Sequence, residues 1–165
     1  MVNKKIVLTG ASRGIGRELA KIYSDKNRVV TLQREKCPIS NDNISSVRTD
    51  FLKPAELTAV LKKNDNLFFD ADVLINNAAV VTSKPFILMG DNDIAAQINV
   101  NLTSAIILTK YILKGMMRRK RGTIINITSM APRVKASGDT VYAASKMALE
   151  NFSQILNQEV TQFGI

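Results

Sequence analysis

Short apolar runs alternate along the chain with longer stretches in which apolar residues recur every three or four positions. The runs are rich in β-branched residues, which is typical of buried parallel strands, and the longer stretches have the period of helices. This pattern predicts strands at residues 4–8, 28–32, 46–49, 72–75 and 123–128, and helices at residues 17–26, 54–63, 91–119 and 141–163.

Strands that alternate with helices indicate an α/β fold, and we expect a doubly wound, Rossmann-like parallel sheet. Its five strands should have the order 3-2-1-4-5. A chain of 165 residues is long enough for one core, so residues 1–165 are interpreted as a single domain. The proline-containing segments at residues 35–45, 80–90 and 131–139 are expected to be loops.

Composition places the chain among ordinary globular proteins, with 45% hydrophobic and 22% charged residues. The lone Cys37 excludes an internal disulfide and fits a reducing compartment. No apolar run approaches the ~20 residues of a membrane span. We therefore expect a cytoplasmic protein and, since the chain has no histidine, no metal site.

The net charge of +9 is partly concentrated in the basic run at residues 118–121. Such a run can bind nucleic acid or an anionic membrane surface. It can also complement the negative end of a helix, with Gly122 terminating that helix. We prefer the second interpretation and keep nucleic-acid binding as an alternative function.

A glycine-rich turn, TGASRGIG at residues 9–16, follows the first predicted strand and opens the first predicted helix. In such turns the first glycine permits the tight turn, the second lets the backbone approach a pyrophosphate, and the third lets the helix pack on the strand. The helix N-terminus adds N–H donors and positive potential. The turn therefore predicts dinucleotide binding.

Ser129, Tyr142 and Lys146 form a second candidate site. Ser129 should emerge at the carboxyl end of a strand, the edge at which open parallel sheets bind ligands. Tyr142 and Lys146 lie four residues apart and share a helix face, so the ammonium can make the phenol a stronger acid suited to proton transfer. The alternative is a half-buried ring and a solvated lysine.

The spacing of Ser129, Tyr142 and Lys146, together with the T-G-x-x-x-G-x-G pattern, resembles the short-chain dehydrogenases and reductases over the whole chain. The resemblance implies an oxidoreductase that transfers a hydride between NADP(H) and a small carbonyl or alcohol substrate. It implies that Tyr142 is the general acid or base, that Lys146 activates it and holds the nicotinamide ribose, and that Ser129 binds the substrate oxygen. Asn101 would anchor a water that connects Lys146 to solvent.

The resemblance also implies a set of cofactor contacts. Arg13 and Arg34 favour NADP(H) over NAD(H), because position 33 holds glutamine rather than an acidic residue. Asp50 should contact the adenine ring, or else cap a turn, and Ala79 replaces a family glycine and would be strained at positive φ. The expected cofactor-binding residues are Gly10, Ser12, Arg13, Gly14, Ile15, Gly16, Arg34, Asp50, Asn77, Ala78, Tyr142 and Lys146.

Further expectations concern assembly and extent. The two long helices at residues 91–119 and 141–163 should mediate a homo-oligomer. In the family another strand pairs beside the one that ends before Ser129, so residues 123–128 should form an unpaired edge and the chain should be a fragment or a truncated relative. Such a chain would be poorly soluble and nearly inactive by itself. A non-catalytic dinucleotide-binding or scaffold relative remains an alternative function.

Overall fold

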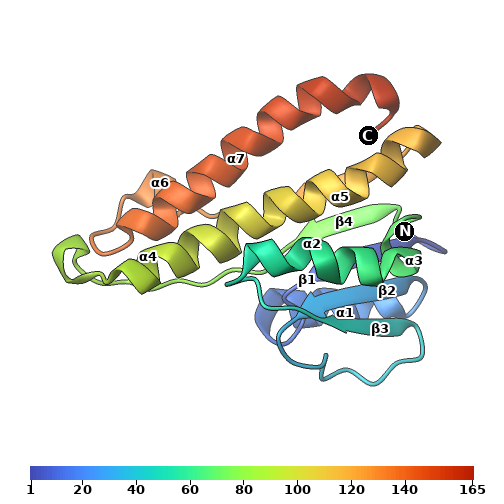
Figure 1. Cartoon of the computed structure of the whole chain (residues 1–165), viewed down its shortest axis with the longest axis horizontal. Coiled ribbons are helices and arrows are strands. Elements are labelled where there is room, and N and C mark those ends of the chain that lie inside the picture. Colours follow the sequence, from blue (N-terminus) through green and yellow to red (C-terminus); the bar gives the residue numbers. More distant parts are fainter.

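The computed structural model describes residues 1–165 and contains one parallel sheet of five strands. The strand order is β3-β2-β1-β4-β5, which confirms the predicted fold class and order (Figure 1). Central strands β1 and β4 are almost fully buried, as their apolar runs require. The strands are β1 (Lys5–Thr9), β2 (Arg28–Gln33), β3 (Ile44–Arg48), β4 (Val73–Asn76) and β5 (Thr123–Asn126).

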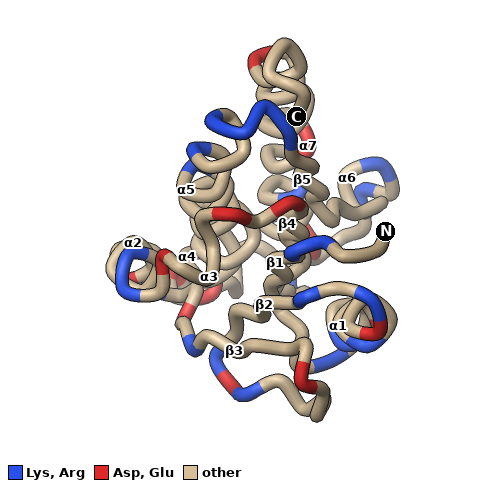
Figure 2. Tube along the Cα trace, turned by 90° about the vertical axis from the view of Figure 1, so that its right-hand side faces the viewer, with Lys and Arg blue, Asp and Glu red and all other residues tan.

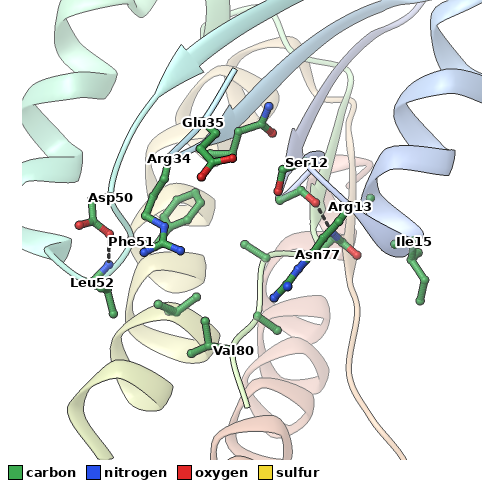
Figure 3. A pocket seen from close by; sticks show the side chains of 17 residues that line it. Ser12, Arg13, Ile15, Arg34, Glu35, Asp50, Phe51, Leu52, Asn77 and Val80 are labelled. Atoms are coloured by element: carbon green, nitrogen blue, oxygen red, sulfur yellow. Dashed lines mark hydrogen bonds between the residues drawn. The ribbon is translucent and has the colours of Figure 1, made fainter. Parts of the chain in front are cut away.

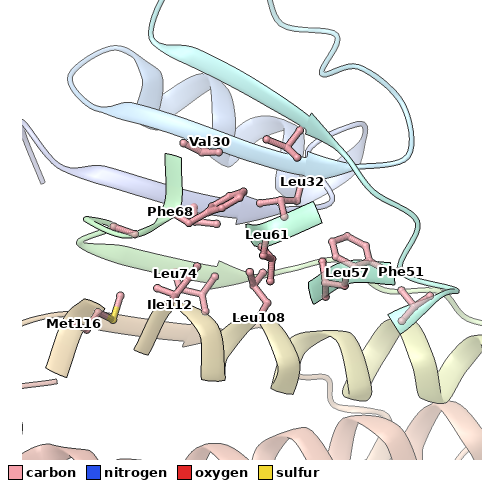
Figure 4. Close-up of a cluster of buried hydrophobic side chains, with 14 residues drawn as sticks. Val30, Leu32, Phe51, Leu57, Leu61, Phe68, Leu74, Leu108, Ile112 and Met116 are labelled. Carbon is pink, nitrogen blue, oxygen red and sulfur yellow. The ribbon is translucent and has the colours of Figure 1, made fainter. Parts of the chain in front are cut away.

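Helices cover both faces of this sheet. Side chains from the sheet, α2 and α5 meet in one apolar core, which includes Leu57, Leu74 and Leu108 (Figure 4), and a second core includes Ile6, Leu8 and Ala20 of α1. The helical elements are α1 (Gly14–Ser24), α2 (Pro54–Lys63), α3 (Asp65–Phe68), η1 (Phe86–Leu88), α4 (Asp91–Ile98), η2 (Asn99–Thr103), α5 (Ser104–Arg119), α6 (Ala131–Val134), α7 (Thr140–Val160) and η3 (Thr161–Phe163).

The predicted helix at residues 91–119 is present but not uniform. It consists of α4, a π-helical turn η2, and α5, and the backbone stays right-handed helical at both junctions. π turns often mark functional sites. Asn101 lies in this turn and is buried, so the irregularity coincides with a predicted site residue. The turn packs against α7, as does α4.

The end of α5 differs from the prediction. Lys120, rather than Gly122, adopts the left-handed conformation that ends the helix, with φ of 52°. Gly122 has a different role, because a Cβ atom there would lie 2.4 Å from Sδ of the buried Met116. The glycine therefore makes room for a core side chain.

The basic run at residues 118–121 makes intramolecular contacts. Arg119 donates two hydrogen bonds of 2.6 Å to the carbonyl oxygens of Phe69 and Ala71, and the Arg118 guanidinium lies 5.2 Å from the Phe69 ring centroid. Figure 2 shows the run at the C-terminal end of α5. These contacts support the structural interpretation of the run, because two of its cations hold α5 against the segment before β4.

Strand β5 pairs only with β4, which confirms the predicted sheet edge. Its residues are half-buried or exposed, whereas β4 on the other side is buried. The predicted loops at residues 80–90 and 131–139 contain the short helices η1 and α6, and α3 lay outside the prediction. None of the helices combines the length and apolar composition needed to span a bilayer.

Candidate active site

A cavity of about 450 Å³ opens at the carboxyl ends of β1, β2 and β4 (Figure 3). Doubly wound sheets bind ligands at this edge, and the volume is that of a cofactor or ligand pocket. Every predicted cofactor-binding residue lines it except Tyr142 and Lys146. Those lining residues are Gly10, Ser12, Arg13, Gly14, Ile15, Gly16, Arg34, Asp50, Asn77 and Ala78.

The geometry of the three glycines is compatible with their predicted roles, and the approach of a pyrophosphate to Gly14 remains a prediction. Gly10 has φ of 71°, and a Cβ atom there would lie 2.9 Å from Cα of Ala78. At Gly16 a Cβ atom would lie 2.2 Å from the carbonyl oxygen of Gly10, so only glycine lets the helix approach the turn this closely. Gly14 faces open space, with no atom within 4 Å of a Cβ, and its backbone is accessible to a ligand.

The first residues of α1, Gly14 to Gly16, line this cavity. Arg13 caps the helix without a side-chain hydrogen bond, and the first turn contains no acidic residue. These N–H groups lack intrahelical partners and carry the positive end of the helix dipole. The cradle therefore fits the pyrophosphate of a dinucleotide.

The end of β2 contributes the polar wall of the pocket. Oε1 of the buried Gln33 accepts a 2.9 Å hydrogen bond from the Ala11 N–H, which ties β2 to the glycine-rich turn. Figure 3 shows Arg13 and Arg34 reaching into the hollow from opposite sides, with Glu35 beside Arg34. No ion pair joins Arg34 to Glu35.

Glu35 is the charged pocket residue that sequence analysis missed, and the apolar lining residues Phe51, Leu52, Val80 and Val100 were not predicted either. The prediction assumed no carboxylate near Arg34, because it considered only the last position of the strand and placed residues 35–45 in a loop. The loop begins inside the pocket, so its first side chain reaches the cavity. The only available signal was that Glu35 directly follows the predicted phosphate-binding arginine.

Asp50 forms the turn that one of its interpretations predicts, and its contact with an adenine ring remains a prediction. It lines the pocket, and its Oδ1 accepts a 3.0 Å hydrogen bond from the Leu52 N–H, which forms the local turn. Ala79 is not among the residues with positive φ, so its methyl group causes no backbone strain. Asn77 Nδ2 donates to the carbonyl oxygens of Thr9 and Gly10, and so holds β4 against the glycine-rich turn.

Ser129 follows β5 and begins the turn that leads into α6. Its Oγ accepts a 3.1 Å hydrogen bond from the Ala131 N–H. Because the oxygen is the acceptor in that bond, the hydroxyl proton stays free to be donated to another group. Ser129 is half-buried, so a small molecule can reach it.

Lys146 lies on α7 and is only 2% exposed, which excludes the alternative of a solvated lysine. Its Nζ donates a 2.8 Å hydrogen bond to the carbonyl oxygen of Ile127, two residues before Ser129. This bond brings the helix that carries Tyr142 and Lys146 against the segment that carries Ser129. Burial lowers the pKa of Lys146 below its ordinary value.

That ammonium has three hydrogens and one protein partner, which leaves two donors for a ligand. Tyr142 lies one helical turn before Lys146 and is half-buried. Incompletely paired, buried titratable groups are more common at functional sites than elsewhere. The arrangement can therefore bind hydroxyl groups and exchange a proton at this end of the sheet.

Asn101 connects the two halves of the site. Its Oδ1 accepts a 2.8 Å bond from the Val80 N–H, and its Nδ2 donates to the Val80 carbonyl at 2.9 Å and to Ser145 Oγ at 3.0 Å. Ser145 directly precedes Lys146. The side chain thus clamps the wall of the pocket to α7, and the implied role in anchoring a water remains a prediction.

Comparison with known proteins gives consistent matches over nearly the whole chain. The family model described as short chain dehydrogenase matches residues 4–165. A 3-oxoacyl-[acyl-carrier-protein] reductase, FabG, from Buchnera aphidicola is 33% identical over 98% of this chain and 70% of its own length. A short-chain dehydrogenase from Streptomyces avermitilis superposes with a TM-score of 0.89 at 26% identity, over 100% of this chain and 63% of that one. The closed form of a serine dehydrogenase complexed with NADP+ superposes with a TM-score of 0.84 at 25% identity, over 93% and 65%.

Proposed function

This chain belongs to the short-chain dehydrogenase family, and from that premise we propose that it transfers a hydride between NADP(H) and a small carbonyl or alcohol compound. Lys146 carries the proposal, because a buried ammonium with two unused donors beside the Ser129 segment has no structural explanation of its own. The glycine-rich turn also supports the proposal. Gly10 and Gly16 allow close packing of the backbone, and Gly14 leaves its backbone open to a dinucleotide.

The chemistry divides between cofactor and protein. The nicotinamide supplies or accepts the hydride. Tyr142 donates the proton to the substrate oxygen during reduction and removes it during oxidation. Ser129 donates its free hydroxyl hydrogen to the same oxygen, where negative charge develops. Lys146 would use its two remaining donors to hold the nicotinamide ribose next to Tyr142.

The preference for NADP(H) rests on Arg13 and Arg34, which line the pocket and can bind the additional 2'-phosphate. Glu35 opposes this preference, because a carboxylate at the same wall repels a phosphate and can accept hydrogen bonds from ribose hydroxyls. Asp50 lines the same pocket, so two guanidinium groups are matched by two carboxylates, and the proposed preference rests on the arginines as phosphate ligands rather than on a net positive charge.

The rival functions are less well supported. A scaffold relative needs neither an incompletely paired buried lysine nor a serine with a free hydroxyl hydrogen, and this chain has both. A nucleic-acid binder would need the cations at residues 118–121 to be free, whereas Arg118 and Arg119 contact the protein.

The first experiment measures binding of NADPH and NADH to residues 1–165 by cofactor fluorescence, followed by NADPH oxidation with a panel of carbonyl compounds. A 3-oxoacyl thioester belongs in that panel, because it is the substrate named for the FabG relative. Tyr142→Phe should retain NADPH affinity and lower whatever turnover the wild-type chain has by at least about 100-fold, since it removes the proton donor and keeps the ring. Comparable turnover in wild type and Tyr142→Phe would remove Tyr142 from its role.

A further inference from the structure

Three polar side chains on one face of the α4–η2 helix contact every second residue of the segment 80–84. Asn101 pairs with the backbone of Val80 as described above, and Oε1 of Gln97 accepts a 3.3 Å hydrogen bond from the Thr82 N–H. Asp93 Oδ2 lies 2.6 Å from Nζ of Lys84. The residues that hold the segment, Asp93, Gln97 and Asn101, are called the polar ladder below.

The spacing of the polar ladder matches two different periods. Residues four apart on a helix are displaced by about 6.0 Å along its axis. Residues two apart in an extended chain are displaced by about 6.6 Å. Contacts at i, i+4 and i+8 on the helix can therefore meet alternate residues of an extended segment without accumulating a large mismatch. The burial of the segment alternates accordingly, with Val81 and Ser83 exposed and Thr82 and Lys84 half-buried.

The ladder is buried at its centre and charged at its outer end. Gln97 is completely buried, and its Nε2 lies within hydrogen-bond range of the Asp93 carbonyl oxygen and of Met89 Sδ. Gln97 is the only buried residue of α4, and a fully buried amide is costly unless its hydrogen bonds are made. At the outer end, the hydrogen bond from Lys84 lowers the pKa of Asp93, as expected for a carboxylate held by an ammonium.

The segment joins the two halves of the site. Val80 lines the cofactor pocket, and at the other end the Lys84 N–H donates a 3.2 Å hydrogen bond to the carbonyl oxygen of Gly138. In the sequence, Gly138 belongs to the loop between Ser129 and Tyr142. Its φ is 94°, and a Cβ atom there would lie 3.1 Å from Ser83 Oγ. A change in the position of residues 80–84 would therefore displace both a residue that lines the pocket and the loop before Tyr142.

We propose that Gln97 and Asp93 are positioning residues that, with Asn101, fix residues 80–84 as a rigid wall between the cofactor pocket and the loop that precedes Tyr142. The inference rests on the proposed function and extends it to two residues that touch neither cofactor nor substrate. Gln97 sets the middle of the wall through the Thr82 N–H, and Asp93 sets the end next to Gly138 through Lys84.

The test compares Gln97→Met with Asn92→Met in the full chain. Gln97→Met keeps the length and burial of the side chain but removes the acceptor for the Thr82 N–H, whereas Asn92 is an exposed residue of α4 outside the ladder. We expect amide hydrogen exchange at Thr82 to accelerate about tenfold in Gln97→Met, the equivalent of one lost hydrogen bond, and to stay unchanged in Asn92→Met. The Val80 amide should stay protected in both, because Asn101 still binds it.

Function should change selectively as well. With Gln97→Met we expect the KM for the carbonyl substrate to rise while the Kd for NADPH stays at the wild-type value, because the cofactor side of the wall is held by Asn101. Gln97→Glu keeps an oxygen acceptor at the same position, and at a pH low enough to keep this buried carboxyl group neutral it should restore protection of Thr82. A residue with only a structural role would lower substrate binding, cofactor binding and stability together.

Two results would overturn the inference. One is unchanged Thr82 exchange in Gln97→Met, and the other is a loss of NADPH affinity that parallels a fall in the melting temperature. If wild type fails to bind NADPH, the proposed function is wrong, and the exchange rate at Thr82 still decides whether the ladder holds the segment.

Discussion

Lys146 places a positive charge in the interior next to a single carbonyl oxygen. Burying an ammonium that has too few partners costs free energy, and replacing such a group by an apolar one of similar volume is often neutral or stabilising. The residue is therefore retained at the expense of stability, which is common for groups that bind a ligand.

Lys146→Met should raise the free energy of unfolding of the ligand-free protein by about 1 kcal/mol and weaken NADPH binding at least about tenfold. Burial lowers the pKa of Lys146, so below that pKa its charge opposes folding. As the pH rises toward the ordinary lysine value of about 10.4, the unfolded chain holds more protons and the wild type becomes relatively more stable. The advantage of the variant should thus shrink from pH 7 to pH 10, as measured by urea denaturation. A variant that is less stable at pH 7 would contradict this.

Arg34 and Glu35 should have opposite effects on cofactor choice because both side chains line the same wall. Arg34→Gln removes a charge-assisted contact worth roughly 1.5 to 3 kcal/mol, so NADPH should bind at least about tenfold more weakly while NADH changes little. Glu35→Gln should strengthen NADPH binding, because a like charge near the phosphate is removed. Fluorescence titrations with both cofactors measure the ratio, and equal losses for NADPH and NADH would rule out phosphate recognition by Arg34.

At the scale of elements, short local features decide where α5 ends and how it meets β5. Lys120 has a left-handed conformation, which costs a non-glycine residue roughly 1 kcal/mol. Position 122 requires glycine because Met116 occupies the space that a side chain would need. Lys120 therefore ends the helix, which is the role that the sequence predicted for Gly122. The packing of Met116 explains why position 122 is glycine, although the helix already ends at Lys120.

Lys120→Gly should therefore stabilise the protein by about 1 kcal/mol, which thermal denaturation can measure. Lys114→Gly is the matched control, because Lys114 is an exposed lysine inside α5 and glycine there should destabilise the helix by about 1 kcal/mol. A loss of stability in Lys120→Gly would mean that the lysine side chain, rather than the backbone conformation, terminates the helix.

At the scale of the whole molecule, α4, η2 and α7 pack against one another along one side of the sheet (Figure 1). Two large apolar side chains of α7, Met147 and Ile155, remain 45% and 50% exposed, and they lie eight residues apart on one helix face. Exposed apolar residues aligned along a helix are characteristic of interaction surfaces. We expect a second copy of the chain to cover this face, as the family resemblance implies.

Met147→Glu combined with Ile155→Glu should shift the protein to monomers in sedimentation experiments, because two charges would be buried in the interface. Ile22→Glu on α1 is the control, since that side chain is 62% exposed on the other helix layer and should leave assembly unchanged. Equal sedimentation of wild type and the double variant would place any interface elsewhere.

Much of this protein follows from local sequence. Apolar runs and helical periods identify every strand and the four main helices, because backbone pairing and amphipathic burial act through neighbouring residues. The positions of several candidate site residues also follow, since the carboxyl ends of parallel strands meet at one edge and place the turn at residues 9–16, Asn77 and Ser129 there. The spacing of Tyr142 and Lys146 needs only the pitch of a helix.

Only the tertiary structure decided the remaining features, because each depends on how separate segments of the chain pack together. The burial of Lys146 requires β5 beside α7, and the role of Gly122 requires Met116 beneath it. Glu35 becomes a pocket residue because the loop after β2 begins at the cavity. The polar ladder exists because an extended segment lies along a helix with a matching repeat, and neither period alone reveals the other.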